Sequence, residues 1–178
     1  MDIPDSTPKI LTLGSFSISV GGNPVAKNWP DESIKMLFCS LLSPLDLFFT
    51  WDRISRSLLG EPATRTSRRR LEELCVRPLK SFLLKELGCN PLISGPEGIR
   101  INQQLIQIDA LEFYRTFLEG LRLLSFENDA AAHDKFSRAN FLYAGEYLPG
   151  ITGKIIDHTR SDLESLYRAA VMDAVRQA

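Results

Sequence analysis

The feature that most constrains the fold is a basic amphipathic segment at residues 63–83. Its apolar residues recur at spacings of three and four, which places them on one side of an α-helix: Leu71, Leu74, Cys75, Leu79, Phe82 and Leu83. Six basic residues and two acidic ones lie at positions 65–80, although the whole chain has a formal charge of −1. Because a local basic patch displaces the counterions of a DNA duplex, the segment predicts a nucleic-acid recognition helix. The alternative is an ordinary solvated face rich in arginine, and the neighbouring elements decide between them.

One residue conflicts with a regular helix in this segment. Pro78 has no backbone N–H to donate to the carbonyl of Leu74, and its ring crowds the preceding turn, at a cost of up to about 3 kcal/mol. We therefore expect the helix to bend or to end early at Pro78.

The elements on either side of the basic segment predict a winged helix. Strand-like residues at 9–20 precede a turn, and Asp31 and Thr50 stand where the N-caps of two further helices are expected. After the basic segment, short strands flank the glycine and proline residues of 95–98, a composition typical of a hairpin tip. In a winged helix the third helix lies in the major groove, and the hairpin contacts the DNA backbone or the minor groove.

Ordered sequence matches extend this interpretation over nearly the whole chain. In the first half the matching stretches are 10–16 (ILTLGSF), 34–42 (IKMLFCSLL), Leu79-Lys80 with Leu83, and 98–101 (GIRI). In the second half they are Ile108-Asp109, Phe113, Phe136, Ala139, Leu142-Tyr143, 145–150 (GEYLPG), Arg160 and Leu163. With these stretches the chain resembles the SARP-type bacterial transcriptional regulators, in which an OmpR-like winged helix is followed by a helical bacterial transcriptional activator domain. In that family the helical domain is associated with activation, oligomerisation and signal reception, and it extends several helices further than Ala178.

The second half of the chain predicts three amphipathic helices. Their apolar stripes are Phe113, Phe117, Leu121 and Leu124, then Ala132, Phe136, Ala139 and Tyr143, and finally Leu163, Leu166, Ala170 and Val171. Small residues facing large ones are typical of tetratricopeptide-type helix pairs. Asp109 and Glu112 have the spacing of a capping box at the start of the first helix.

The predicted fold class is therefore α+β, with two domains. Residues 1–104 form a winged helix-turn-helix DNA-binding domain, and residues 105–178 form part of an all-α, tetratricopeptide-like activator domain. The first domain contains 13 basic and 11 acidic residues, whereas the second contains 8 and 11. Only the first domain has a charge that suits DNA.

We expect eight residues at the DNA interface: Arg65, Arg68, Arg69, Arg70, Glu73, Arg77, Lys80 and Arg100. The arginines at 68–70 would contact phosphates at the edge of the groove, and Glu73 and Arg77 are candidates for base edges. Lys80 and Arg100 would add contacts to the DNA backbone.

Catalysis, metal binding and cofactors are not indicated. His133 and His158 are the only histidines, and no zinc-protease, nucleophile-elbow, phosphate-loop or dinucleotide-binding motif is present. Cys39, Cys75 and Cys89 are odd in number and widely spaced, so we expect buried free thiols instead of disulfides or a zinc site. No apolar run approaches the roughly 20 residues needed to span a bilayer, and the first residues lack a signal peptide, so a cytoplasmic protein without membrane contact is expected.

The sequence thus predicts a sequence-specific DNA-binding regulator, an activator that binds double-stranded DNA at promoters and recruits partners such as RNA polymerase. The alternative is a protein-interaction or signalling module whose winged helix no longer binds DNA, which Pro78, the two adjacent glutamates and the acidic second half would favour. Because stacked helix pairs bury their faces on neighbours, a second copy or further helices are expected to cover an apolar interface at Leu166, Ala170, Val171 and Val175.

Overall fold

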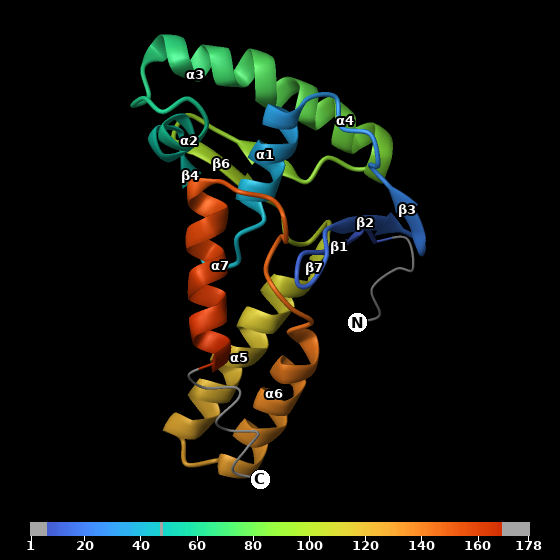
Figure 1. The fold of residues 1–178 in the computed structure, drawn as a ribbon, viewed down its shortest axis with the longest axis vertical. Coiled ribbons are helices and arrows are strands. Elements are labelled where there is room, and N and C mark those ends of the chain that lie inside the picture. The colour runs from blue at the N-terminus through green and yellow to red at the C-terminus, as the bar shows by residue number, and fades with distance from the viewer. Residues whose placement is uncertain (1–6, 47, 169–178) are drawn as a thin grey trace.

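The computed structural model of the chain describes residues 7–46 and 48–168 (Figure 1). The first half contains β1 (Lys9–Leu11), β2 (Ser17–Val20), β3 (Asn23–Val25), α1 (Glu32–Leu41), β4 (Phe49–Thr50), α2 (Trp51–Leu58), α3 (Arg65–Leu71), the π-helical segment η1 (Glu72–Val76), α4 (Arg77–Leu87), β5 (Leu92–Ser94) and β6 (Gly98–Ile101). The second half contains β7 (Gln107–Ile108), α5 (Asp109–Ser125), α6 (Asp129–Leu142) and α7 (Lys154–Leu166). The predicted class is confirmed: an α+β winged helix is followed by a helical part.

Two small sheets frame the winged helix. The first has the order β3-β2-β1-β7, in which β1 and β2 pair antiparallel and β7 joins β1 in parallel, with Ile10 opposite Ile108. The second has the order β4-β6-β5, and its β5–β6 hairpin is the wing. Glycine is required at position 98, where β6 pairs with β4, because a Cβ at this position would lie 2.0 Å from the carbonyl oxygen of Phe49.

Side-chain caps begin the three helices of the winged helix. The Asp31 carboxylate accepts a hydrogen bond from the Ser33 N–H at 2.8 Å, as the sequence predicts, and Thr50 accepts one from Arg53. Thr64 and Ser67 form a reciprocal capping box at the start of α3. These caps satisfy N–H groups that have no partner within their own helices, so the three helix starts are determined locally.

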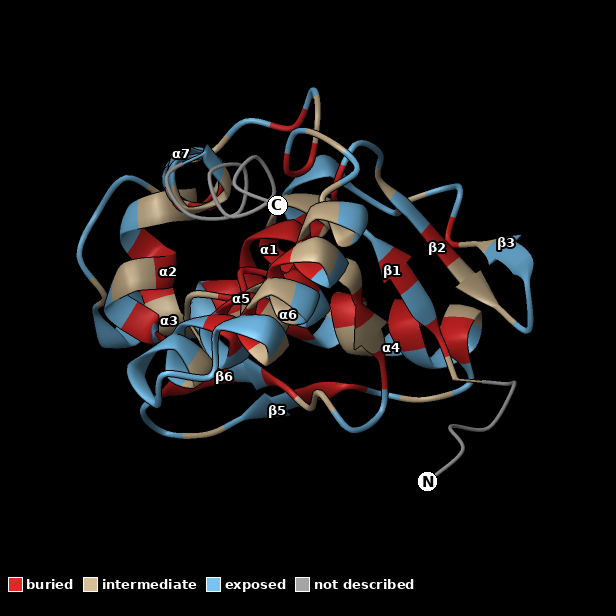
Figure 2. Cartoon of the chain, turned by 90° about the horizontal axis from the view of Figure 1, so that it is seen from below, coloured by how far each residue is buried: buried red, intermediate tan, exposed pale blue. Residues whose placement is uncertain are grey.

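The core centres on α1, which lies between α2 and the first sheet (Figure 2). Leu37 and Phe38 are completely buried, and the Trp29 ring packs on Phe38 and on Phe82 of α4. The cluster of buried side chains continues from this helix into α5, α6 and α7. The two halves of the chain therefore share one continuous core.

The helices α5 and α6 form a hairpin below the sheets (Figure 1). The two helices approach closely at Gly120, where a Cβ would lie 2.8 Å from the Phe136 ring. Phe117 also packs against Phe136, as the predicted stripes require. The prediction is wrong for Leu121 and Leu124, which are exposed, because among the described residues α6 covers the side of α5 that carries Gly120.

Contacts between the two halves form a polar seam, which consists of Thr12, Leu13 and Ser43 on one side and Asp109, Tyr147 and Thr159 on the other. The Asp109 carboxylate accepts hydrogen bonds from the Thr12 N–H at 2.7 Å, the Thr12 hydroxyl at 2.6 Å and the Leu13 N–H at 3.0 Å. The predicted capping box of Asp109 and Glu112 is therefore wrong, because this carboxylate bonds across the seam instead. Ile108 is the N-cap of α5 and contributes no side-chain bond.

Arg160 of α7 holds the loop at 145–151 beside the seam. Its guanidinium group donates to the carbonyl oxygens of Tyr147, Leu148 and Ile151 at 2.9, 2.8 and 2.6 Å. Tyr147 in turn bridges to Leu13 of the first half, and the Ser43 and Thr159 hydroxyls lie 2.8 Å apart. The domain boundary before residue 105 stays a prediction, and these bonds join its two sides.

Candidate nucleic-acid interface

The predicted recognition helix is one long, curved helical run made of α3, η1 and α4 (Figure 1). In η1 the Arg77 N–H donates to the carbonyl of Glu72, five residues back, instead of four. Pro78 follows directly, in the first turn of α4, where its missing N–H is tolerated. The expected bend or early end of regular helix near Pro78 therefore takes the form of a π-helical segment directly before the proline, after which the α-helix continues.

The π-helical segment changes which residues face the core. Leu71, Cys75, Leu79, Phe82 and Leu83 are buried, which confirms most of the predicted apolar stripe. Leu74 does not belong to it, because 60% of its surface is exposed, and Val76 takes a buried position with 3% exposed. An extra residue in one turn rotates the following side chains around the axis, and uninterrupted α-helical spacing does not predict this rotation.

The exposed face of the helix carries Arg65, Arg69, Arg70 and Arg77, and Arg100 is exposed on strand β6 of the wing. Within residues 7–46 and 48–168, no ion pair involves Arg65, Arg70, Arg77 or Arg100. Their guanidinium groups are available to an external anion. This arrangement matches what a DNA phosphate backbone requires.

Arg69 and Glu73 neutralise one another on the same face. Arg69 Nε lies 2.8 Å from Glu73 Oε1, and this hydrogen bond raises the pKa of Arg69 and lowers the pKa of Glu73. Both side chains are solvent-exposed, so the pair is easily broken by a competing ligand. Glu73 is therefore occupied by Arg69 in the absence of DNA.

Two of the residues expected to contact DNA connect the helix to the wing in this structure. Arg68 Nη1 donates to the Pro96 carbonyl at the wing tip at 2.8 Å, and its guanidinium group lies 5.0 Å from the Trp51 ring centre. Arg68 also pairs with Glu72 at 3.2 Å. Lys80 Nζ donates to the Ser94 hydroxyl at 2.6 Å. These bonds set the position of the wing relative to the helix.

Sequence reasoning missed Trp51 as part of this arrangement. Its indole N–H donates to the Gly95 carbonyl at 2.9 Å, so the Trp51 ring contacts both the wing tip and Arg68. The position of Trp51 directly after the N-cap Thr50 is visible in the sequence, but its partner in the wing lies 44 residues further on. No local pattern connects the two residues.

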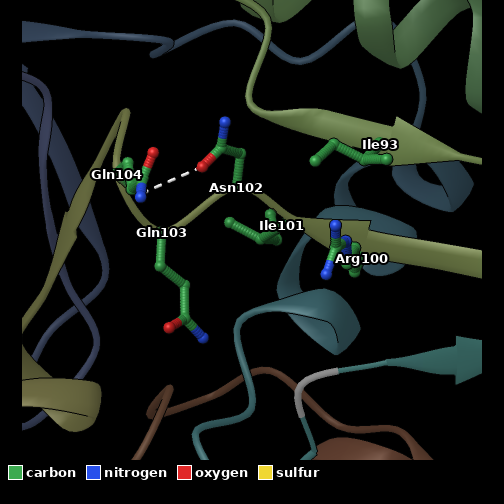
Figure 3. A pocket seen from close by; sticks show the side chains of 6 residues that line it. All are labelled: Ile93, Arg100, Ile101, Asn102, Gln103 and Gln104. Atoms are coloured by element: carbon green, nitrogen blue, oxygen red, sulfur yellow. Dashed lines mark hydrogen bonds between the residues drawn. The ribbon is translucent and has the colours of Figure 1, made fainter.

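A hollow of about 330 Å³ lies at the base of the wing (Figure 3). It is lined by Ile93, Arg100, Ile101, Asn102, Gln103 and Gln104. The Gln104 backbone N–H donates to the Asn102 side chain at 3.1 Å. The lining includes one cation and three amides but no nucleophile or general base, so the hollow has no catalytic constellation.

The expected interface of the helical part is only partly described. Leu166 is half-buried and packs against the core. Ala170, Val171 and Val175 lie outside the described residues. Next to Leu166, the Tyr167 ring stacks on Tyr143 with ring centres 4.0 Å apart. In the part of the chain that the structure describes, no helix combines the length and the apolar character needed to cross a bilayer.

Comparison with known proteins indicates a fold but not a family. No protein-family model matches the chain, and no curated protein matches it in sequence. A solved structure of Mycobacterium tuberculosis EmbR, in complex with a low-affinity phosphopeptide, is similar with a TM-score of 0.58 and 19% sequence identity. The similarity covers 95% of this chain and 43% of the EmbR chain, so this chain spans less than half the length of EmbR. This likeness shows a fold like that of the EmbR structure, with a winged helix and a helical part.

Proposed function

We propose that the chain is a DNA-binding transcriptional regulator of SARP type that acts by binding double-stranded DNA and recruiting partners. The observation that carries the proposal is the set of four exposed arginines without ion pairs among the described residues: Arg65, Arg70, Arg77 and Arg100. They lie on the helix and the hairpin that contact DNA in winged-helix proteins. The SARP-like fold supports the same function.

The eight residues expected at the interface take different roles in this proposal. Arg65, Arg70 and Arg100 contact phosphates, and Arg69 joins them when DNA displaces Glu73. Arg77 is the stronger candidate for a base edge, because Glu73 is occupied by Arg69. Arg68 and Lys80 position the wing, and their effect on DNA binding is indirect.

The other proposed properties follow from this role. The protein acts in the cytoplasm as an activator, without catalysis, and contacts RNA polymerase at a promoter. The tetratricopeptide-like helical part receives a signal and associates with a second copy or with further helices through the surface near Leu166.

The test is the salt dependence of binding to duplex DNA, measured by fluorescence anisotropy. Each phosphate contact contributes about 0.9 to the slope of log affinity against log salt. Arg70→Ala is expected to lower the slope by about this amount and to weaken binding to all sequences. The matched control is Arg122→Ala, which removes an exposed arginine of α5 that lies outside the interface and is expected to leave the slope unchanged.

Two results would contradict the proposal. If wild-type protein shows no salt-dependent binding to duplex DNA, the winged helix is a protein-docking module and the regulator proposal is wrong. If Arg70→Ala and Arg122→Ala lower the slope equally, binding is diffuse and the interface is not on α3.

A further inference from the structure

Leu74 is a large apolar side chain in the middle of the basic face. With 60% of its surface exposed, it is directed to solvent instead of the core. Its direction results from η1, because uninterrupted α-helical spacing would place it with Leu71 and Cys75 on the buried side. The backbone geometry therefore presents this side chain outward.

The free charges nearest to Leu74 along the helical run are cations, because the adjacent Glu73 is paired with Arg69. Arg70 lies four residues before Leu74 and Arg77 three residues after it. Both arginines are exposed and have no ion pair among the described residues. A ligand that matches this surface must offer an apolar group to Leu74 and an anion to each of the two arginines.

A wholly apolar protein surface does not meet this requirement, because covering Leu74 would remove Arg70 and Arg77 from water, and an unpaired buried charge is strongly destabilising. A protein partner would have to place carboxylates on both sides of its apolar contact. The major groove of DNA meets this requirement, because phosphates border the groove and the C5-methyl group of thymine is the apolar group displayed on its floor. Leucine and this methyl group are complementary in size and polarity.

We propose that Leu74 is a specificity-determining residue that contacts the C5-methyl group of a thymine, while Arg70 and Arg77 hold the helix in the groove. This inference rests on the proposed function and adds a base preference to it. The π-helical segment then has a direct role in recognition, because it directs Leu74 toward the DNA. A thymine is favoured at one position of the bound sequence.

The experiment begins by selecting duplexes that bind the wild-type chain from a library of random sequence. Each thymine of a selected duplex is then replaced by deoxyuridine, which removes only the methyl group. At one position the replacement is expected to weaken wild-type binding about fourfold, the fold-change that corresponds to about 0.8 kcal/mol for one buried carbon group. Leu74→Ala is expected to bind the thymine and deoxyuridine duplexes equally.

Leu84→Ala is the matched control, because Leu84 lies on the same helical run and 56% of its surface is exposed. This variant is expected to keep the wild-type preference for thymine. Thermal unfolding monitored by circular dichroism verifies that both variants are folded, and since both side chains are exposed, both are expected to fold.

The possible outcomes separate the two proposals. If no duplex is enriched and no binding is measurable, the proposed function and this inference both fail. If duplexes bind but deoxyuridine has no effect at any position, or if Leu74→Ala keeps the thymine preference, the role of Leu74 is wrong while DNA binding stands.

Discussion

Arginine has different partners in two regions of the molecule: the recognition surface, which is the exposed side of α3, η1 and α4, and the polar seam together with the loop at 145–151 that Arg160 holds beside it. On the recognition surface, Arg70 and Arg77 are exposed and have no ion pair among the described residues. At the seam, only 18% of the Arg160 side chain is exposed, and its donors bond to three backbone carbonyls and to the carboxylates of Glu146 and Asp157. The same residue type thus offers charge to an external ligand in one region and holds a loop in the other.

This difference shows that the position of the guanidinium partners, and not the number of arginines, determines the role. Within the recognition surface itself, Arg68 resembles Arg160, because its guanidinium group donates to the Pro96 carbonyl. Arg70, two residues further along the helix, has no such contact among the described residues. Substitutions in the two regions are therefore expected to change different properties.

The largest effect is expected at the seam, from Arg160→Ala. Loss of the guanidinium group removes the hydrogen bonds that Arg160 donates to the carbonyls of Tyr147, Leu148 and Ile151, and we expect the free energy of unfolding to fall by about 3 kcal/mol. Urea unfolding monitored by circular dichroism measures this change. Arg77→Ala, on the recognition surface, is expected to leave the midpoint unchanged. Equal midpoints for the two variants would contradict the comparison.

The second effect concerns Asp109, the acidic residue of the seam. Asp109→Asn removes the charge and one of the acceptors that serve Thr12 and Leu13, and a loss of about 2 kcal/mol in unfolding free energy is expected. The control is Asp134→Asn, at an exposed position of α6. If both variants unfold at the wild-type urea concentration, the Asp109 bonds do not join the two halves.

The third prediction concerns Cys39 of α1, which lies beneath the seam. Burial raises the pKa of the Cys39 thiol from its ordinary value near 9 to about 12. Because the folded-state pKa is the higher one, the stabilisation is complete below pH 9 and is lost as the pH rises from 9 to 12. Between pH 8 and pH 10, Cys39 should contribute about 1.4 kcal/mol to the fall in unfolding free energy.

The measurement compares wild type with Cys39→Ala in urea at pH 8 and pH 10. The variant is expected to lose less stability over this interval, although its cavity makes it less stable at pH 8. Parallel losses in the two proteins would show that the Cys39 thiol ionises as easily in the folded state as in the unfolded chain.

The smallest effect is expected at Pro78, on the recognition surface. Proline in a regular helix interior costs about 3 kcal/mol, so Pro78→Ala would stabilise a strained helix by a similar amount. Here η1 has already changed the hydrogen bonds, and Pro78→Ala should instead destabilise by less than about 1 kcal/mol, because alanine gives the unfolded chain more freedom. A large gain in thermal stability would show that Pro78 is strained.

Local features of the winged helix could be predicted from the sequence. Asp31 and Thr50 cap their helices as expected, because a cap depends on residues two or three positions away. The buried stripe from Leu71 to Leu83 follows from helical spacing, with Leu74 as the exception. The eight residues expected at the DNA interface were selected by their charge and position, and their contact with DNA stays a proposal.

The sequence by itself determined the helix starts, the basic segment and the α+β class, because capping, periodicity and charge act over a few neighbouring residues. The remaining features depend on residues that are distant in the chain. Tertiary structure decided that Lys80 bonds Ser94, 14 residues away, and that Asp109 bonds Thr12, 97 residues away. It also decided that Leu74 faces solvent, because the helix on both sides of Pro78 must bury its apolar residues in one core, and the extra residue of η1 allows both sides to do so.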